Sequence, residues 1–418
     1  MRPSRADAAP AAAVADGSAP IRIFTEARLY REPAGGFVTL DRSSADGAWR
    51  PYRDRWADAQ LVARVGDVRP GDDDALSVGP IEVRPLPYYT GPRQLLAQLP
   101  RLVTAVIRTT SDISLCMFRL PGPIGFIGSL WCRLRGRRYA VEVVGDPVDV
   151  LRSGVAGSAG VRLAAACGVV MRWAVGGAAT AHYVTEQTLQ RHYPASRATS
   201  THVFSNVDLH EDDFTAAPRS ERPAIRRLIA VGTHDQLYKG HDDLIRAVGL
   251  LRADYPELRL RLVGDGRHSA LLRSLAARTG VEDRVEFVGR VDSRTRLREL
   301  LDTSDLFCMP SRTEGLPRAL IEAMARGVPS IGTTVGGIPE LLPAELLVPP
   351  DDPVRLATLI TRLADDPRLA AAASQIAWQT AQRFRPEEMA RRRSAWYAAL
   401  AELTSRGKVP VEANRGDS

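Results

Sequence analysis

From residue 225 onward, short apolar segments alternate with helical ones, and this alternation restricts the possible folds more than any other feature of the chain. The pattern predicts strands at 228–231, 258–263, 285–288, 306–309 and 330–332, and helices at 241–252, 270–279, 294–301, 317–326 and 353–364. Strands that alternate with helices of this length form a parallel sheet joined by right-handed crossovers. We therefore expect residues 224–385 to form one complete Rossmann-like domain.

The first half of the chain shows the same kind of pattern less regularly. Strands are predicted near 21–25, 81–85, 113–118, 139–144, 181–184 and 201–204, with helices between several of them. A chain of 418 residues is long enough for two hydrophobic cores. Residues 21–217 are therefore expected to form a second Rossmann-like domain, so that the fold class is α/β with two such domains.

The remaining segments complete the predicted organisation. Residues 218–223 have the composition of a linker, and the ends 1–20 and 406–418 have the composition of disordered segments. Residues 371–405 are helical in pattern, but Pro386 removes a backbone donor and is expected to kink the helix. The part after the kink, 386–405, is expected to cross back onto the first domain.

The net charge of the chain alone excludes few classes of binding partner. Lys and Arg number 56 against 49 Asp and Glu, for a net charge of +7. The clusters at 133–138 and 391–393 contain no interleaved aromatic residues, so we expect no nucleic-acid partner. A solvated face and attraction to a membrane surface or an anionic substrate both stay open as interpretations of these clusters.

The cysteines and the apolar segments indicate a compartment. The four cysteines have no C-x-x-C spacing, which argues against a metal cage or a disulfide framework and fits a reducing compartment. The most apolar stretch, 113–131, is interrupted by Arg119, Pro121 and Pro123, so it is not expected to span a membrane. We expect a cytoplasmic protein, and peripheral contact with the inner face of the membrane stays open.

The turn before the helix at 317–326 carries the strongest chemical signal. Ligands of such sheets bind beyond the carboxyl ends of strands, and phosphates favour helix N-termini. Gly315 allows a close backbone approach, and the amides near Gly315 and Leu316 can hold a phosphate. Glu314 and Glu322 can accept hydrogen bonds from sugar hydroxyls. Taken alone, however, each glutamate is better explained as a solvated charge.

Four other turns carry weaker signals. Lys239 precedes Gly240 at a helix start, where it can neutralise a diphosphate, although a solvated loop lysine explains it equally well. Glycine-containing turns at 262–266, 288–291 and 336–340 also permit close approach of a ligand, but glycine is common at strand ends.

Taken in order, these turns resemble the retaining glycosyltransferases of family 4, which have the GT-B fold. The matching segments are 232–240, 263–266, 285–289, 304–307, 310–329 and 336–340. Shorter phrases at 24–27, 119–122, 144–147, 183–186 and 205–208 resemble a bacterial subset that makes glycans and exopolysaccharides. The resemblance implies two Rossmann-like domains that face each other across a cleft.

The resemblance also implies a role for each matched residue. Glu314 would contact the donor sugar, Glu322 the nucleotide ribose and Lys239 the diphosphate. The remaining donor-binding positions that it implies are Gly232, Gly315, Leu316, Arg290 and Val291.

Two positions depart from the family pattern. Thr233 follows Gly232 where many members have Arg, so one diphosphate cation is missing or is supplied by Arg312 or Arg318. Many members also carry a histidine at the end of a strand in the first domain, and the matching position here is Asp146. Asp146 is therefore a candidate catalytic residue, and a plain turn residue is the alternative.

The implied activity is transfer of a hexose from a nucleoside-diphosphate sugar to a glycan, a lipid-linked acceptor or a small molecule such as a secondary metabolite. The seven histidines are dispersed, so no metal ion and no other cofactor is expected. The leaving diphosphate would be stabilised by Lys239 and by backbone donors. Two alternatives remain, a non-catalytic sugar-nucleotide or carbohydrate-binding protein and a sugar-nucleotide epimerase.

Overall fold

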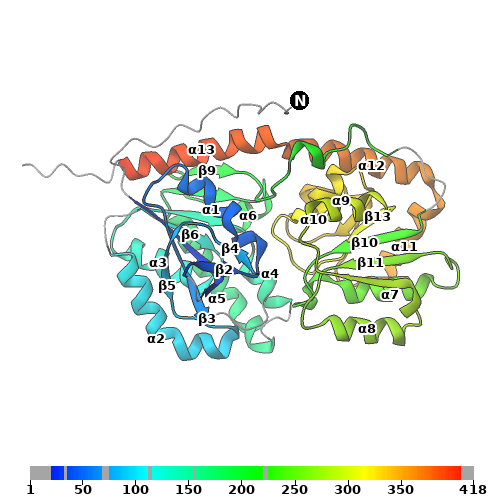
Figure 1. Ribbon diagram of the computed structural model, residues 1–418, viewed down its shortest axis with the longest axis horizontal. Coiled ribbons are helices and arrows are strands. Elements are labelled where there is room, and N and C mark those ends of the chain that lie inside the picture. The colour runs from blue at the N-terminus through cyan, green and yellow to red at the C-terminus, as the bar shows by residue number, and fades with distance from the viewer. Residues whose placement is uncertain are drawn as a thin grey trace, which may run out of the picture.

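The computed structural model describes residues 20–32, 35–67, 75–111, 115–153, 157–219 and 225–405. The predicted disordered ends, apart from residue 20, and most of the predicted linker at 218–223 lie outside these residues. Two α/β domains lie side by side (Figure 1), and each is built on its own mainly parallel sheet. The predicted fold class, two Rossmann-like domains, is confirmed.

The C-terminal domain has a six-stranded parallel sheet in the order β12-β11-β10-β13-β14-β15. The strands are β10 (Arg227–Val231), β11 (Arg259–Val263), β12 (Val285–Gly289), β13 (Leu306–Met309), β14 (Ser330–Thr333) and β15 (Leu347–Val348). One face is covered by α7 (His241–Leu251), α8 (Ser269–Arg278) and α11 (Pro353–Asp365), and the other by α9 (Arg294–Asp302), α10 (Arg318–Ala325) and α12 (Pro367–Ala381), as Figure 1 shows. All five predicted strand–helix units are present, whereas β15 was not predicted.

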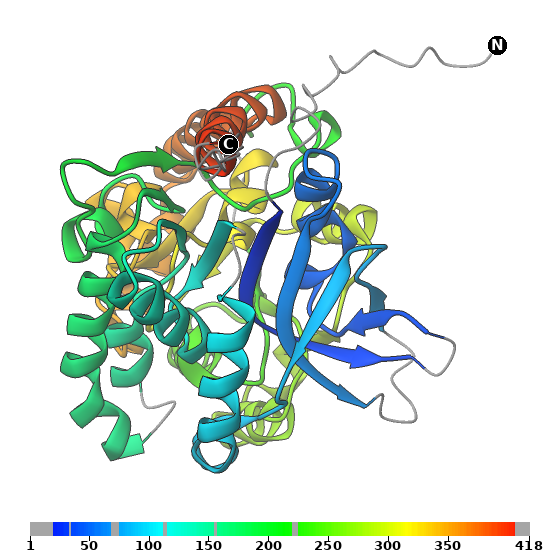
Figure 2. The same ribbon diagram turned by 90° about the vertical axis from the view of Figure 1, so that its left-hand side faces the viewer.

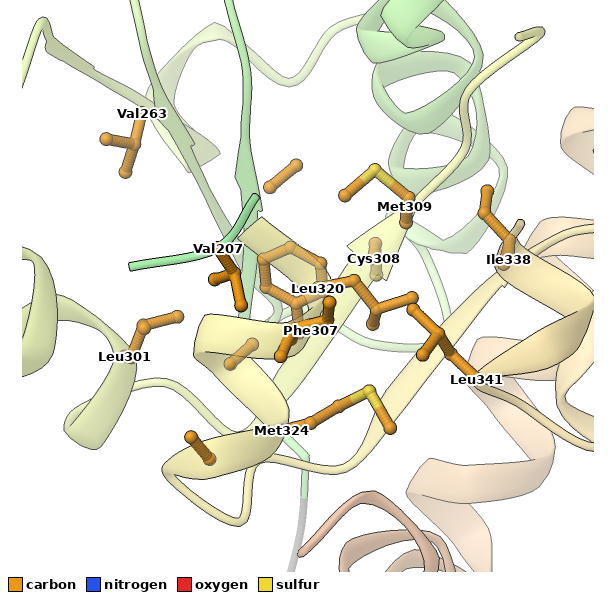
Figure 3. Close-up of a cluster of buried hydrophobic side chains, with 14 of the residues drawn as sticks. Val207, Val263, Leu301, Phe307, Cys308, Met309, Leu320, Met324, Ile338 and Leu341 are labelled. Atoms are coloured by element: carbon orange, nitrogen blue, oxygen red, sulfur yellow. The ribbon is translucent and has the colours of Figure 1, made fainter. Parts of the chain in front are cut away.

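The core of this domain anchors the turn between β13 and α10. Every residue of β13 is buried, and Leu320 and Met324 of α10 pack with Phe307 of β13 and with Ile338 and Leu341 (Figure 3). Fully burying side chains of this size stabilises the fold by about 1.5–3 kcal/mol each. The loop at 310–317 is therefore held at both ends by elements that cannot move independently.

The N-terminal domain has a nine-stranded sheet whose parallel part runs β5-β3-β1-β6-β7-β8-β9. Its strands are β1 (Ile21–Arg31), β2 (Phe37–Thr39), β3 (Gln60–Asp67), β4 (Leu76–Ser77), β5 (Glu82–Leu86), β6 (Leu115–Leu120), β7 (Tyr139–Val143), β8 (Thr180–Tyr183) and β9 (Ser200–Val203). β2 pairs antiparallel with the end of β1, and β4 with β2. The prediction missed β2, β3 and β4 and made β1 too short.

Helices cover both faces of this sheet. One face carries α2 (Gly91–Thr109), α3 (Pro123–Leu134) and α5 (Gly157–Gly176), and the other carries α1 (Asp46–Arg53) and α13 (Pro386–Ser405). α13 begins at Pro386 after a short turn, and its Trp396 packs against His182 and His202 of the first domain. The last helix of the chain thus lies on the N-terminal domain (Figure 2).

Candidate active site

Lys239 and Glu314 form an ion pair where two neighbouring strands end. They follow β10 and β13, which are parallel neighbours, so the turns after them meet at one edge of the sheet. The ammonium Nζ of Lys239 donates to Oε1 of Glu314 at 2.7 Å, and the Ser311 hydroxyl donates to the same oxygen at 2.7 Å. Only 20% of the Lys239 side chain and 9% of the Glu314 side chain are exposed.

The electrostatics of the pair favour the charged form of Lys239. Burial alone would lower the pKa of the ammonium, but the Glu314 carboxylate and the Tyr238 hydroxyl raise it, and the net shift is upward. A charged ammonium and a carboxylate are thus held together in a largely dehydrated position. A ligand that carries both hydroxyls and phosphate can replace this mutual contact by one contact to each group.

Arg312 holds the two turns of the pair together. Its guanidinium donates to the carboxylates of Asp242, Asp243 and Asp351 at 2.5–3.0 Å and to the carbonyl oxygen of Leu237 at 2.5 Å. These carboxylates already bind its guanidinium, so of the two arginines offered for the missing diphosphate cation Arg312 is the more engaged one.

Arg318 remains as the candidate for that cation. It is the first residue of α10, its side chain is exposed, and its charge is close enough to Lys239 to oppose protonation of the ammonium. Within the described parts of the chain, no carboxylate lies in ion-pair range of Arg318.

The other predicted donor-binding residues lie around this pair. A Cβ on Gly232 would come within 3.3 Å of the Lys239 side chain, and the Thr233 hydroxyl donates to the carbonyl oxygen of Asp265 at 3.4 Å. Three further predicted residues lie as follows: Glu322 is half-buried on α10, Arg290 pairs with Asp292 after β12, and Val291 packs at the edge of the core.

The predicted phosphate-binding backbone touches the other domain. A Cβ on Gly315 would lie 2.2 Å from the carbonyl oxygen of Val144, which follows β7 of the N-terminal domain. Leu316 packs against hydrophobic residues of both domains. The segment 315–316 therefore lies at the contact between the two domains.

Glu340 makes a second contact between the domains. Its carboxylate accepts hydrogen bonds from the amides of Glu186, Gln187 and Thr188, at 2.5, 3.1 and 2.6 Å. These amides begin α6 (Thr188–His192), where a carboxylate also interacts favourably with the helix dipole. The turn at 336–340, which the sequence singled out only weakly, thus bridges the two domains.

Asp146 has a different environment from the one expected of an exposed catalytic carboxylate. It is 4% exposed and caps α4 (Pro147–Arg152) by accepting from the amide of Val148 at 2.8 Å. The hydroxyl of Tyr193 donates to the same carboxyl oxygen at 2.5 Å, and Nδ1 of His192 lies 2.8 Å from the other one. In this structure the carboxylate holds the loop after β7 in place.

His241 lies close to Lys239 and makes the stability of the C-terminal domain depend on pH. It is the first residue of α7 and 4% exposed, and its pKa is lowered to about 3 by burial and by the charges of His234 and Lys239. The unfolded chain takes up this proton near pH 6.5, so the stability contribution is present above that pH and is lost as the pH falls towards 3.

We expect His241→Gln to reduce the loss of stability in acid. Between pH 7 and pH 5 the wild-type chain should lose about 2 kcal/mol of unfolding free energy through this residue. Urea denaturation at the two pH values measures this loss. An equal loss in the variant and the wild type would show that His241 is not the group responsible.

Comparison with known proteins shows which family and which relatives this chain is similar to. Residues 225–366 match the family described as glycosyl transferases group 1. The chain is 28% identical to protein CapJ of Staphylococcus aureus over 317 residues, which is 75% of this chain and 79% of CapJ. It is 32% identical over 262 residues to a GDP-mannose-dependent monoacylated alpha-(1-6)-phosphatidylinositol monomannoside mannosyltransferase of Corynebacterium glutamicum, which is 58% of this chain and 60% of that relative.

Solved structures agree on the fold. Sucrose-phosphate synthase from Thermosynechococcus elongatus superimposes with a TM-score of 0.65 at 21% identity, over 91% of this chain and 99% of that chain. HepE of Anabaena, in complex with UDP-glucose, superimposes with a TM-score of 0.62 at 19% identity, over 91% of this chain and all of that one. Both likenesses extend over the two domains.

The described residues offer neither a metal-ligand cluster nor a membrane-spanning helix. No three His, Cys, Asp or Glu side chains come together there as the ligands of a metal ion would. In the same residues, no helix has the length and apolar character needed to cross a bilayer.

Proposed function

We propose that this chain is a group 1 glycosyl transferase, on the match of residues 225–366 to that family and on its GT-B fold. The chain transfers a hexose from a nucleoside-diphosphate sugar to a glycan, lipid-linked or small-molecule acceptor, with retention of configuration and without a metal ion. The observation that carries the proposal is the largely buried pair of Lys239 and Glu314 at the strand ends beside α10. The reaction takes place in the cytoplasm or at the inner face of the membrane.

The pair supplies complementary contacts to one donor molecule. Glu314 accepts hydrogen bonds from hydroxyls of the donor sugar, and Lys239 neutralises the diphosphate. The first amides of α10 have no partner within the helix and are available to the phosphate oxygens, as are those near Gly315 and Leu316. Arg318 adds the second positive charge, in place of the arginine that Thr233 replaces.

In the proposed step the bond between the sugar C1 and the diphosphate oxygen breaks, and the diphosphate leaves with the electron pair. The acceptor oxygen forms its bond to C1 on the same face, and its proton passes to the leaving diphosphate. Lys239 stabilises the charge that develops on the diphosphate, as preorganised donors do in a site from which water is largely excluded. No separate base is needed for this proton transfer.

The remaining residues have supporting roles in the proposal. Glu322 binds the ribose, Arg290 and Val291 flank the base, and the backbone at Gly232 approaches the diphosphate. Asp146 acts as a positioning residue, because its carboxylate orders the loop that touches Gly315.

A panel of nucleoside-diphosphate sugars tests the proposal. We expect one donor to raise the melting temperature, since a ligand at about 100 times its dissociation constant stabilises a protein by about 2.7 kcal/mol. That donor should then release nucleoside diphosphate when an acceptor is added, with EDTA having no effect. Binding without release under any acceptor would favour the non-catalytic alternative, and isomerisation of the donor without an acceptor would favour an epimerase.

The stereochemistry needs its own measurement. The proton spectrum of the product reports its anomeric configuration. We expect the same anomer as in the donor, and the opposite anomer would contradict the retaining reaction while leaving the donor site intact.

A further inference from the structure

Three neighbouring helices of the N-terminal domain have an unusual composition. The 19 residues of α2, the 12 of α3 and the 20 of α5 contain neither Asp nor Glu, although the whole chain has 49 acidic residues among 418. α3 contacts both α2 and α5, so the three helices form one layer over the sheet (Figure 2). We call the outward side of this layer the α2–α3–α5 face.

The α2–α3–α5 face exposes large aliphatic side chains. Within the described parts of the chain, it carries eight of the twelve large hydrophobic residues that are exposed. Among them Leu96 is 69% exposed, Leu134 67%, Val169 58% and Leu163 57%. Exposed aliphatic residues gathered on one layer, rather than scattered over the surface, indicate a site that binds another protein or a membrane.

These side chains are not needed for the core of the domain. The inward sides of the same helices already pack on the sheet through Leu102, Val106, Ile124, Met171 and Val175. The outward sides of the helices therefore expose aliphatic residues that the core of the domain does not use.

The same three helices and the turn after α3 also carry nine arginines. They are Arg93, Arg101, Arg108, Arg133, Arg162 and Arg172 on the helices and Arg135, Arg137 and Arg138 just after α3. In the described parts of the chain, none of them pairs with a carboxylate, whereas arginines such as Arg312 and Arg294 elsewhere pair with two or three.

Two tryptophans lie among these arginines. Arg133 stacks 4.1 Å from the ring centre of Trp173, and Arg135 lies 5.0 Å from that of Trp131. Arginine, tryptophan and exposed leucine together are typical of surfaces that lie in the interface of a bilayer.

We propose that the α2–α3–α5 face docks on an anionic lipid surface. Unpaired arginines attract the head groups, and the leucines and valines enter the boundary with the acyl chains. A second copy of the chain fits less well, because the same face would place arginines against arginines. If the proposed transfer is correct, this docking brings the N-terminal domain to a membrane and selects a lipid-linked acceptor from the three acceptor classes.

Sedimentation with vesicles tests the docking. We expect the wild-type chain to bind vesicles that contain phosphatidylglycerol, to bind phosphatidylcholine vesicles much less, and to dissociate at high salt. Replacing Arg101, Arg138 and Arg162 with Gln should weaken binding by about tenfold or more. Leu134→Ser combined with Leu163→Ser should weaken it as well, since the apolar insertion is reduced.

Matched variants remove the same charge, or the same number of exposed leucines, outside the α2–α3–α5 face. Replacing the exposed Arg197, Arg278 and Arg368 with Gln removes the same net charge, and Leu250→Ser with Leu271→Ser removes exposed leucines of the other domain. Both controls should bind as the wild type does. Equal binding to neutral and anionic vesicles, or equal losses in face and control variants, would overturn the proposal.

Sedimentation velocity and the thermal shift with donor distinguish failure of the docking proposal from failure of the proposed transfer. Self-association in sedimentation velocity that the leucine variant abolishes, without vesicle binding by the wild type, would assign the face to a second copy and overturn the proposal. The thermal shift with donor should be unchanged in all variants. A wild type that binds vesicles but no donor would contradict the proposed transfer while leaving the docking supported.

Discussion

Glu314→Gln is expected to lower transfer by about two orders of magnitude and also to destabilise the C-terminal domain. The loss of transfer follows from one missing hydrogen bond of a charged acceptor to the sugar, worth about 1.5–3 kcal/mol. The loss of stability follows because Lys239 would keep its charge in a largely buried position. Breaking a buried ion pair costs about 3–5 kcal/mol, and we expect about 2 kcal/mol here because a fifth of the Lys239 side chain is exposed.

The double variant Lys239→Met, Glu314→Gln separates these two effects. Replacing both charges removes the unpaired ammonium, so the free energy of unfolding should return to within about 1 kcal/mol of the wild type. Transfer should stay lost, since neither the sugar nor the diphosphate regains its partner. Urea denaturation and the release of nucleoside diphosphate measure the two quantities independently.

An exposed pair in the same domain serves as the control. Arg261 and Glu286 lie 2.8 Å apart with 24% and 55% of their side chains exposed. Replacing them with Met and Gln should change stability by less than about 1 kcal/mol and leave transfer unchanged. Full transfer by the double variant at 239 and 314 would show that the site is elsewhere, and full stability of Glu314→Gln would show that the pair is not coupled to folding.

The C-terminal domain could be predicted because its short apolar strand segments and its amphipathic helices are strong local signals. The N-terminal domain was predicted less completely, since its missed strand β3 contains Gln60 and Arg64, which are polar in pattern. Tertiary contacts satisfy both: Gln60 accepts from Arg22 at 2.6 Å and donates to Glu82 at 2.8 Å, while the guanidinium of Arg64 donates to the Tyr89 carbonyl oxygen. Such partners lie 22 to 38 residues away along the chain, so a local pattern does not reveal them.

The candidate site, too, could be predicted from the sequence only in part. The motif order singled out Lys239 and Glu314 as separate residues, but not that they pair across 75 positions of sequence. The sequence also does not show that Asp242, Asp243 and Asp351 converge on Arg312. The structure also adds Ser311, whose hydroxyl binds Glu314 from three residues away.

The capping role of Asp146 has a signal in the local sequence. Asp followed by Pro is a common start of a helix, since the carboxylate accepts from a free amide and proline suits the first helical position. Pro147 stands at that position in α4. The local sequence at Asp146 thus indicates a helix cap, whereas catalysis there rests on the resemblance to a family histidine position alone.

Gly315 is the residue at which the domain contact and the proposed donor site coincide. A Cβ there would lie 2.2 Å from the Val144 carbonyl oxygen, far inside van der Waals contact, and the obstacle is backbone of the other domain. The clash can be relieved without disturbing either core if the domains move apart by about an ångström. A misplacement of that size can cost about 10²-fold in rate, because transfer requires the reacting atoms to be held in one geometry.

We therefore expect Gly315→Ala to reduce transfer by about ten- to a hundredfold with the free energy of unfolding unchanged. Donor binding to the C-terminal domain should persist. The thermal shift with nucleoside-diphosphate sugar therefore shows whether the variant separates the two domains or blocks the donor site. Gly47→Ala is the matched control, because a Cβ at Gly47 meets nothing within 4 Å and should leave transfer intact. Loss of donor binding in Gly315→Ala would mean that the methyl group obstructs the donor itself, and wild-type transfer would mean that the two domains need not meet at this glycine during the reaction.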